Sequence, residues 1–309
     1  MDKIIAVAGP TAVGKTKFAI GIAQVFDGEI VSCDSMQLYK YMNIGSAKPT
    51  TEELEQARHH LVDFLDPREP FSVAQYQKLA KAAIKDIQGR DKLPIISGGT
   101  GLYLNSLLYD MDFFAVPEDF SYRRQLEEMA ANEGREALHR MLQQLDEEAA
   151  SRIHPNNTKK IIRALERLKE GEGRVRPFHE INKETEDYQA ILIGLTRDRA
   201  ELYDRINRRV DSLMEQGLLE EVRQLMELGL SQEHISMKGI GYKELKDYFR
   251  GKISLEKSVE TIKKNTRHYA KKQLTWFRRY DRMNWYNISE FKSDEEALKE
   301  IIKCLEKRI

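Results

Sequence analysis

Cysteine is scarce in this chain of 309 residues, which carries only Cys33 and Cys304. Two isolated thiols provide too few ligands for a structural zinc site and too few pairs for a disulfide framework. We therefore expect both cysteines to stay reduced and to pack as small apolar residues, which favours a cytoplasmic protein.

The chain also lacks a net charge, because its 50 basic and 50 acidic residues cancel. This balance gives no overall reason to expect a polyanionic partner, although a sum hides local patches. No apolar run approaches the roughly 18 residues that a membrane-spanning helix needs, so we expect no contact with a membrane. The first residues lack the basic start and the cleavage site of a signal peptide, and the apolar run that follows them is typical of a strand.

What the chain has is an alternation of short apolar runs and amphipathic stretches. The apolar runs at 4–8, 29–32, 93–97 and 188–195 predict buried strands, and helical patterns at 14–26 and 72–87 separate the first three. Strands that alternate with helices predict an α/β fold, with a parallel sheet flanked by helices.

Only helical periodicity occurs between the third and fourth of these strands, at 122–131, 135–145 and 158–168. The pattern predicts an all-helical insertion domain at 117–187 within a discontinuous core formed by 1–116 and 188–309. In the later part of the core we expect helices at 199–216, 218–228, 242–249, 255–280 and 294–307, and a last strand at 283–287.

The segment Gly9–Thr16 reads G-P-T-A-V-G-K-T and matches the phosphate-loop pattern G-x-x-x-x-G-K-[ST] between a predicted strand and a predicted helix. The core is therefore expected to be P-loop NTPase-like. Lys15 would bridge the outer phosphates, and the Thr16 hydroxyl would hold Mg²⁺. The motif predicts a phosphate-bearing ligand without saying which one. The other candidate diphosphate-binding residues of the loop are Gly9, Thr11, Ala12, Val13 and Gly14, whose backbone N–H groups would converge on phosphate oxygens.

Two further loops follow predicted strands. Asp34 opens the first, D-S-M-Q-L-Y, and Thr100 lies in the second, G-G-T-G-L-Y. A carboxylate at the carboxyl end of a parallel strand points into the crevice where ligands bind. Position alone leaves Asp34 as a general base, as an indirect magnesium ligand or as a helix cap. The second loop is also good turn chemistry and is a weak motif by itself.

These three motifs belong to a longer series that spans nearly the whole chain. In the same order come G-S-A-K-P at 45–49, H-H-L-V-D at 59–63, I-R-A-L-E at 162–166, R-I-N-R-R-V at 205–210, K-G-I-G-Y at 238–242 and K-Q-L-T-W-F-R at 272–278. Taken together, they closely resemble the bacterial tRNA dimethylallyltransferases, of the type without a zinc finger.

The resemblance implies transfer of a dimethylallyl group from dimethylallyl diphosphate to the exocyclic amine of the adenine just 3′ of the tRNA anticodon. The P-loop would then hold an isoprenoid diphosphate with Mg²⁺. The catalytic aspartate of the family falls on Asp34, and its hydroxyl partner falls on Thr100. The diphosphate-binding arginine falls on Arg209, with Arg205 and Arg208 close by in the sequence.

A basic segment at 263–282 carries eight lysines and arginines against one acid, Asp281, with aromatic residues between them. By itself it is equally typical of a solvated helix face whose aromatics lie in the core. Together with the resemblance, the basic segment predicts contact with the anticodon stem-loop of tRNA. We expect the protein to be a monomer. The candidate tRNA-binding residues are Asp34, Ser35, Met36, Gln37, Thr100, Arg123, Thr158, Lys159, Lys160, Ile161, Ile162, Lys238, Gly239, Lys271, Lys272 and Arg278.

Two other functions fit parts of the sequence. A P-loop kinase for a nucleoside or another small molecule would use Lys15 and Thr16 in the same way and could take Asp34 as its base. It leaves the helical insertion and the basic segment unexplained. A nucleotide-gated RNA-binding protein without transfer chemistry is the third possibility.

Overall fold

The computed structural model describes residues 2–111, 121–171, 175, 183–231 and 233–309. The chain divides into two compact units: Met1–Leu108 with Thr185–Ile309, and Tyr109–Glu184. The first boundary falls after Leu108, and the position expected for it, between 116 and 117, lies outside the described residues. The second boundary, expected between 187 and 188, falls after Glu184.

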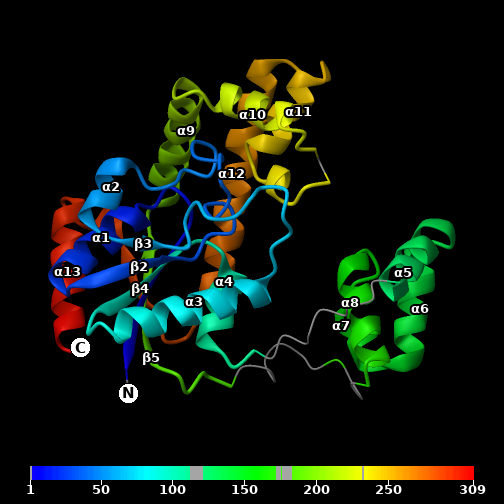
Figure 1. The fold of residues 1–309 in the computed structure, drawn as a ribbon, viewed down its shortest axis with the longest axis horizontal. Helices are drawn as coiled ribbons and strands as arrows, with labels where there is room; N and C mark the ends of the chain where they lie inside the picture. Colours follow the sequence, from blue (N-terminus) through cyan, green and yellow to red (C-terminus); the bar gives the residue numbers. More distant parts are fainter. Residues whose placement is uncertain (1, 112–120, 172–174, 176–182, 232) are drawn as a thin grey trace. The chain divides into compact units, whose positions relative to one another are not determined.

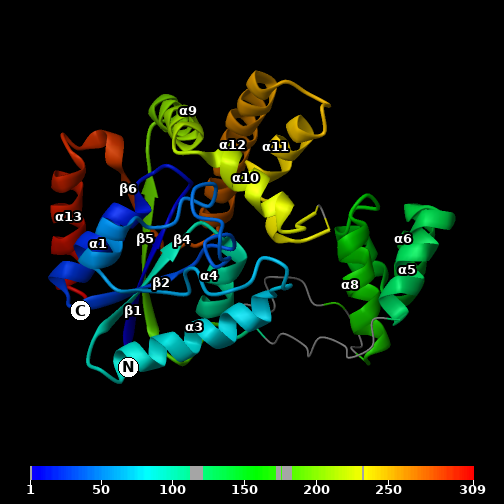
Figure 2. The same ribbon diagram turned by 45° about the horizontal axis from the view of Figure 1, so that its top comes forward.

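The first unit is built on a sheet of six parallel strands, in the order β3-β2-β4-β1-β5-β6. Figure 1 labels β2, β3, β4 and β5, and Figure 2 labels β1 and β6. The strands are β1 (Lys3–Ala8), β2 (Gly28–Ser32), β3 (His59–His60), β4 (Leu93–Gly98), β5 (Gln189–Thr196) and β6 (Asn284–Asn287). The central residues of β1, β2, β4 and β5 are almost fully buried, as expected for a parallel sheet covered on both faces. The prediction of an α/β fold is confirmed.

Helices cover both faces of this sheet, as Figures 1 and 2 show. Alternate side chains of β1, Ile5 and Val7, belong to the core cluster that also contains residues of α1 and α13. The α3 helix contacts β2 and β4 but contributes no residue to this cluster, so it covers the other face. The helices of this unit are α1 (Lys15–Val25), α2 (Thr51–Gln56), α3 (Val73–Gln88), α4 (Gly101–Leu108), α9 (Arg199–Glu215), α10 (Leu218–Glu227), α11 (Tyr242–Phe249), α12 (Leu255–Phe277) and α13 (Asp294–Glu306).

The expected helix at 255–280 ends earlier, at Phe277. The apolar pattern runs on because Tyr280, beyond the helix end, is also buried and donates its hydroxyl hydrogen to Asn105. Among the helices of the described residues, none is long and apolar enough to cross a membrane.

The second unit contains only helices within its described residues: α5 (Ser121–Asn132), α6 (Arg135–Leu145), α7 (Glu147–Arg152) and α8 (Thr158–Lys169). Its core is a separate cluster that includes Leu126, Leu138, Leu142 and Leu165. The three predicted helical stretches are found as α5, α6 and α8. The short α7 is an addition to the predicted set; the Asp146 carboxylate caps it by accepting the N–H of Ala149.

Candidate active site

The phosphate loop joins β1 to α1, as its sequence predicted. Gly14 precedes the helix with φ of 111°, a conformation that side-chain-bearing residues rarely adopt, and so leaves the first N–H groups of α1 facing the loop. The Lys15 ammonium donates to the carbonyl of Pro10 over 2.9 Å. The loop thus has the shape and the charge of an anion-binding site.

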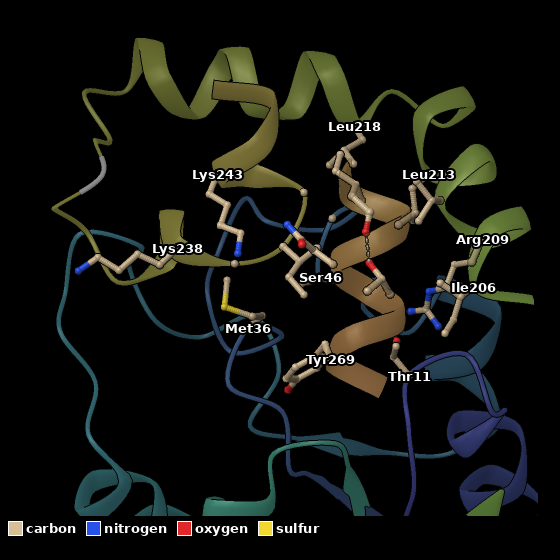
Figure 3. A pocket seen from close by; sticks show the side chains of 18 of the residues that line it. Thr11, Met36, Ser46, Ile206, Arg209, Leu213, Leu218, Lys238, Lys243 and Tyr269 are labelled. Carbon is tan, nitrogen blue, oxygen red and sulfur yellow. Dashed lines mark hydrogen bonds between the residues drawn. The ribbon is translucent and has the colours of Figure 1, made fainter. Parts of the chain in front are cut away.

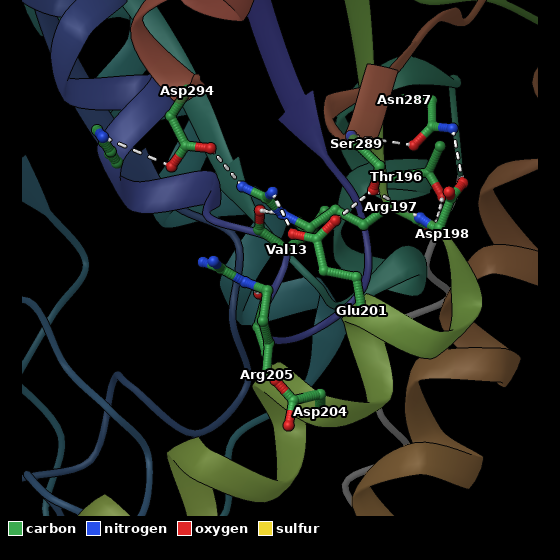
Figure 4. Close-up of polar contacts among 12 residues, drawn as sticks. Val13, Thr196, Arg197, Asp198, Glu201, Asp204, Arg205, Asn287, Ser289 and Asp294 are labelled. Atoms are coloured by element: carbon green, nitrogen blue, oxygen red, sulfur yellow. Dashed lines mark hydrogen bonds and ion pairs between the residues drawn. The ribbon is translucent and has the colours of Figure 1, made fainter. Parts of the chain in front are cut away.

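Two arginines outside the motif donate hydrogen bonds to backbone carbonyls of the phosphate loop (Figure 4). Arg197, which follows β5, donates from Nε to the Val13 carbonyl over 3.1 Å, and Arg205 of α9 donates to the Ala12 carbonyl over 3.0 Å. Arg197 is only 8% exposed and forms ion pairs with Glu201 at 2.6 Å and with Asp294 at 2.5 Å. The loop is therefore tied to α9 and to α13.

A cavity of about 260 Å³ opens in front of the phosphate loop and is lined by Lys15, Thr16 and Asp34. A larger one of about 510 Å³ lies between α9, α11 and α12. Figure 3 shows Arg209 and Thr11 on one side of the larger cavity and Met36 on the other. Five residues line both cavities and form the wall that the cavities share: Thr11, Asp34, Ser46, Arg209 and Tyr269.

Asp34 is held in this common wall by its own loop. Its Oδ1 accepts the N–H groups of Met36 at 2.8 Å and of Gln37 at 3.4 Å, while Oδ2 accepts no hydrogen bond from the described part of the chain. The residues after Asp34 form turns and not a helix. Asp34 therefore caps a turn, and it is not a helix cap. One carboxylate oxygen remains for a ligand.

Thr100 lies against the Asp34 loop. Its Oγ1 accepts the N–H of Ser35 at 3.0 Å and lies 3.3 Å from the Ser35 hydroxyl, and its own N–H donates to the carbonyl of Cys33 over 3.1 Å. The Asp34 loop and the Thr100 loop are therefore joined side by side, because the strands that they follow, β2 and β4, are neighbours in the sheet.

Two cations lie close to Asp34. Burial lowers the pKa of Lys15 to about 8, although the Asp34 carboxylate opposes the shift. Burial also lowers the pKa of Arg209, which makes no hydrogen bond or ion pair within the described residues. Of its neighbours, Arg205 is engaged by the loop and Arg208 is exposed and paired with Asp204 at 2.6 Å. Of the three arginines, Arg209 is therefore the one that lines both cavities and has no partner within the described residues.

The lowered pKa of Lys15 predicts how diphosphate binding depends on pH. A bound anion favours the protonated amine, so affinity for inorganic pyrophosphate should fall as pH rises through about 8, where the free protein loses this proton. The change is measured by calorimetric titration between about pH 7 and pH 9. In Lys15→Arg the guanidinium keeps its charge, so any remaining pH dependence belongs to the ligand. Identical profiles for both proteins would contradict the prediction.

Known proteins resemble this chain over nearly its whole length. The model of the IPP transferase family matches residues 37–280. The chain belongs to the IPP transferase family. It is 49% identical to the tRNA dimethylallyltransferase of Alkaliphilus oremlandii over 97% of this chain and 96% of the relative. The enzyme of the same name from Acetivibrio thermocellus is 47% identical over the same shares.

Solved structures agree with this assignment. The tRNA isopentenylpyrophosphate transferase of Bacillus halodurans superposes with a TM-score of 0.74 at 42% identity and covers 99% of this chain and 98% of its own. A eukaryotic dimethylallyltransferase described as acting on tRNA superposes with a TM-score of 0.85 at 29% identity and covers 98% and 78%. The family resemblance predicted from the sequence is confirmed.

In this IPP transferase, the candidate tRNA-binding residues fall into separate groups. Ser35, Met36, Lys238, Gly239 and Lys272 line the larger cavity with Asp34, whereas Gln37 lines the phosphate-loop cavity. Lys271 and Arg278 are exposed around the last turns of α12, outside both cavities. The basic segment also contains residues that face inward: Lys263 pairs with Asp211 at 2.7 Å, Arg267 donates to Asn207, and Phe277 and Tyr280 are core residues.

The remaining candidates lie in the helical unit. Arg123 makes a two-pronged ion pair with Glu166, with both N–O distances 2.8 Å. Lys159 and Lys160 are exposed, and Thr158 is half-buried. Ile161 and Ile162 are 0% and 5% exposed, so their side chains pack in the core of this unit and only their backbone is left for a contact with RNA.

Two buried polar residues that were not among the candidate site residues also shape the site. Glu221 of α10 accepts the N–H groups of residues 43, 44 and 45 at 2.7 to 3.0 Å, and also the hydroxyl of Tyr242 at 2.9 Å. Gln273 of α12 contacts both the phosphate loop and the Thr100 loop. Each lies on the apolar face of its helix, and a polar residue in that place is the sequence signal that would have found it.

Proposed function

We propose that this IPP transferase moves a dimethylallyl group from dimethylallyl diphosphate to the exocyclic amine of the adenine 3′ of a tRNA anticodon. The observation that carries the proposal is the place of Asp34 in the wall shared by two cavities. The smaller cavity has Lys15 in its wall and suits a diphosphate, and the larger cavity is bordered by Met36 and Lys238; Arg209, like Asp34, lines both. A carboxylate between them suits the point where the two substrates meet.

The chemistry requires a C–O bond and an N–H bond to break while a C–N bond and an O–H bond form. The C1–O bond of the allylic diphosphate breaks and its electron pair leaves with the diphosphate, while the amine nitrogen forms a bond to C1 and gives its proton to Asp34. Lys15 and Arg209 would stabilise the negative charge that grows on the leaving group. An adenine must leave its stack to reach such a site, and Met36 and Tyr269 offer surfaces on which it would lie.

The site also suits Mg²⁺ as part of this proposal. The Thr16 hydroxyl and the Asp34 carboxylate line the same cavity and are hard oxygen donors. Within the described residues no group of three or more His, Cys, Asp or Glu side chains is arranged to hold a metal. The donor set fits an ion bound chiefly by diphosphate oxygens and water, which would offset the charge of the leaving group.

One incubation separates this function from the two alternatives. The protein is mixed with an anticodon stem-loop and labelled dimethylallyl diphosphate, and in parallel with ATP and candidate hydroxyl acceptors. Label in the RNA is the expected result. ATP consumption without labelled RNA would favour a kinase, and RNA binding without either reaction would favour a binding protein.

Neutralising the exposed lysines of α12 should weaken RNA binding, because fewer phosphates are then neutralised. For Lys271→Ala combined with Lys272→Ala, the slope of log affinity against log salt should become shallower by about 0.7 to 0.9 for each phosphate that is no longer bound. The measurement is filter binding of the stem-loop at several salt concentrations. Replacing the inward-facing Lys263 with alanine serves as the matched control and should leave the slope unchanged. A wild-type slope in the double variant would place the RNA elsewhere.

A further inference from the structure

Gln273 joins two loops that the chemistry needs in fixed relation. Its Oε1 accepts the N–H of Thr11 in the phosphate loop over 2.9 Å. Its Nε2 donates to the carbonyl of Gly99 over 2.9 Å, and Gly99 directly precedes Thr100. The residue is only 5% exposed. A single buried amide therefore uses its acceptor on one loop and a donor on the other.

The close approach of α12 to the Thr100 loop explains two glycines of that loop, Gly99 and Gly101. A Cβ added to Gly99 would overlap with the Gln273 amide, and one added to Gly101 would overlap with the Trp276 ring. Two of the three glycines of the motif G-G-T-G, which is weak as a sequence signal, thus make room for α12, while Gly98 makes room for the backbone of Cys33.

These contacts form a continuous chain from the phosphate loop to Asp34. Thr11 is bound to Gln273, Gln273 to Gly99, and the neighbouring Thr100 to the backbone of Ser35, which follows Asp34. The diphosphate end of the site and the carboxylate end are thereby held together by hydrogen bonds through one α12 side chain. A reaction between two bound groups is sensitive to their separation, and a misplacement of about 1 Å can cost as much as 100-fold in rate.

We propose that Gln273 is a positioning residue: it sets the separation between the phosphate loop and the Asp34–Thr100 pair. This inference rests on the proposed function, because it concerns the rate of that transfer. Gln273 itself lines the phosphate-loop cavity, but both ends of its amide are taken by backbone groups. Replacing Gln273 should therefore lower the rate of transfer within the complex with both substrates more than it weakens the affinity for either substrate.

The test uses Gln273→Met, which keeps the length of the side chain and removes both hydrogen bonds. With saturating stem-loop and saturating dimethylallyl diphosphate, the single-turnover rate should fall by roughly 10- to 100-fold. The KM for dimethylallyl diphosphate and the Kd for the stem-loop should stay within about threefold of wild type. Phe277→Leu, a core change on the same helix, is the control for reduced stability and should not reproduce the effect at an equal decrease in melting temperature.

A second measurement does not depend on activity. Without substrates, amide hydrogen exchange of the peptides that contain Thr11 and Thr100 should be faster in Gln273→Met than in wild type. Unchanged exchange would overturn the contact itself. Faster exchange combined with a wild-type single-turnover transfer rate would overturn the positioning role. A raised KM with no decrease in that rate would overturn it as well. If the wild-type protein transfers no label, the proposed function fails, and the exchange data still report on the contact.

Discussion

Replacing Asp34 with alanine should lower the rate of dimethylallyl transfer by roughly 100-fold or more, because a positioned general base contributes about 10²- to 10⁴-fold. Its Oδ2 accepts no hydrogen bond from the described residues, so in the proposed mechanism this oxygen would take the amine proton. RNA binding should change little, since the neighbouring residues of the larger cavity remain. Single-turnover transfer and filter binding measure the two effects separately.

The matched variant is Asp34→Asn. Its amide oxygen still accepts the N–H groups of Met36 and Gln37, so the turn should keep its shape while the charge is removed. A rate as low as that of Asp34→Ala would show that the carboxylate acts as a base and not only as a support for the turn. Full activity in either variant would remove Asp34 from the mechanism.

The sheet and its loops are predictable from the sequence because their signals are local. A strand buried on both faces is a continuous apolar run, and 4–8, 29–32 and 93–97 lie within β1, β2 and β4. The phosphate loop and Asp34 follow directly from such strands, so their meeting at one edge of the sheet is expected from the order of the chain. Parallel strands alone bring these residues together.

The elements that sequence reasoning misses lack a local signal. In α4 every side chain from Tyr103 to Leu108 is buried, so the helix has no polar face and no periodicity to detect. The two-residue β3 at the sheet edge is too short to recognise. The α2 helix has no buried residue and depends on the capping box between Thr50 and Glu53.

In the site, too, some residues have a local sequence signal and others depend on contacts between distant parts of the chain. The motifs predicted roles for Lys15, Thr16 and Asp34. Glu221, in contrast, contacts Asn43, 178 positions away in the chain, and Gln273 contacts Thr11, 262 positions away, and no role was predicted for either. Spacing in the sequence carries no information on such contacts. The resemblance alone places the diphosphate-binding arginine at Arg209, and the structure adds a physical reason: Arg209 lines both cavities, whereas Arg205 is bound to the Ala12 carbonyl and Arg208 to Asp204.

That choice of arginine leads to the second large effect. Arg209→Gln should lower the transfer rate by roughly 10²- to 10³-fold, the range found when one preorganised donor to a developing negative charge is removed. The loss should be large because Arg209 lies in the wall of both cavities and, within the described residues, no acidic side chain forms an ion pair with it. Affinity for inorganic pyrophosphate should weaken in the same variant.

Arg208→Gln is the control, because Arg208 lies on the same helix but is exposed and paired with Asp204. It should transfer at the wild-type rate. Arg205→Gln tests a different role: it frees the Ala12 carbonyl and loosens the phosphate loop without removing a cavity cation. If Arg205→Gln reduced the rate more than Arg209→Gln, the shape of the loop would matter more than the charge facing the leaving group, and the assignment of Arg209 would have to be withdrawn.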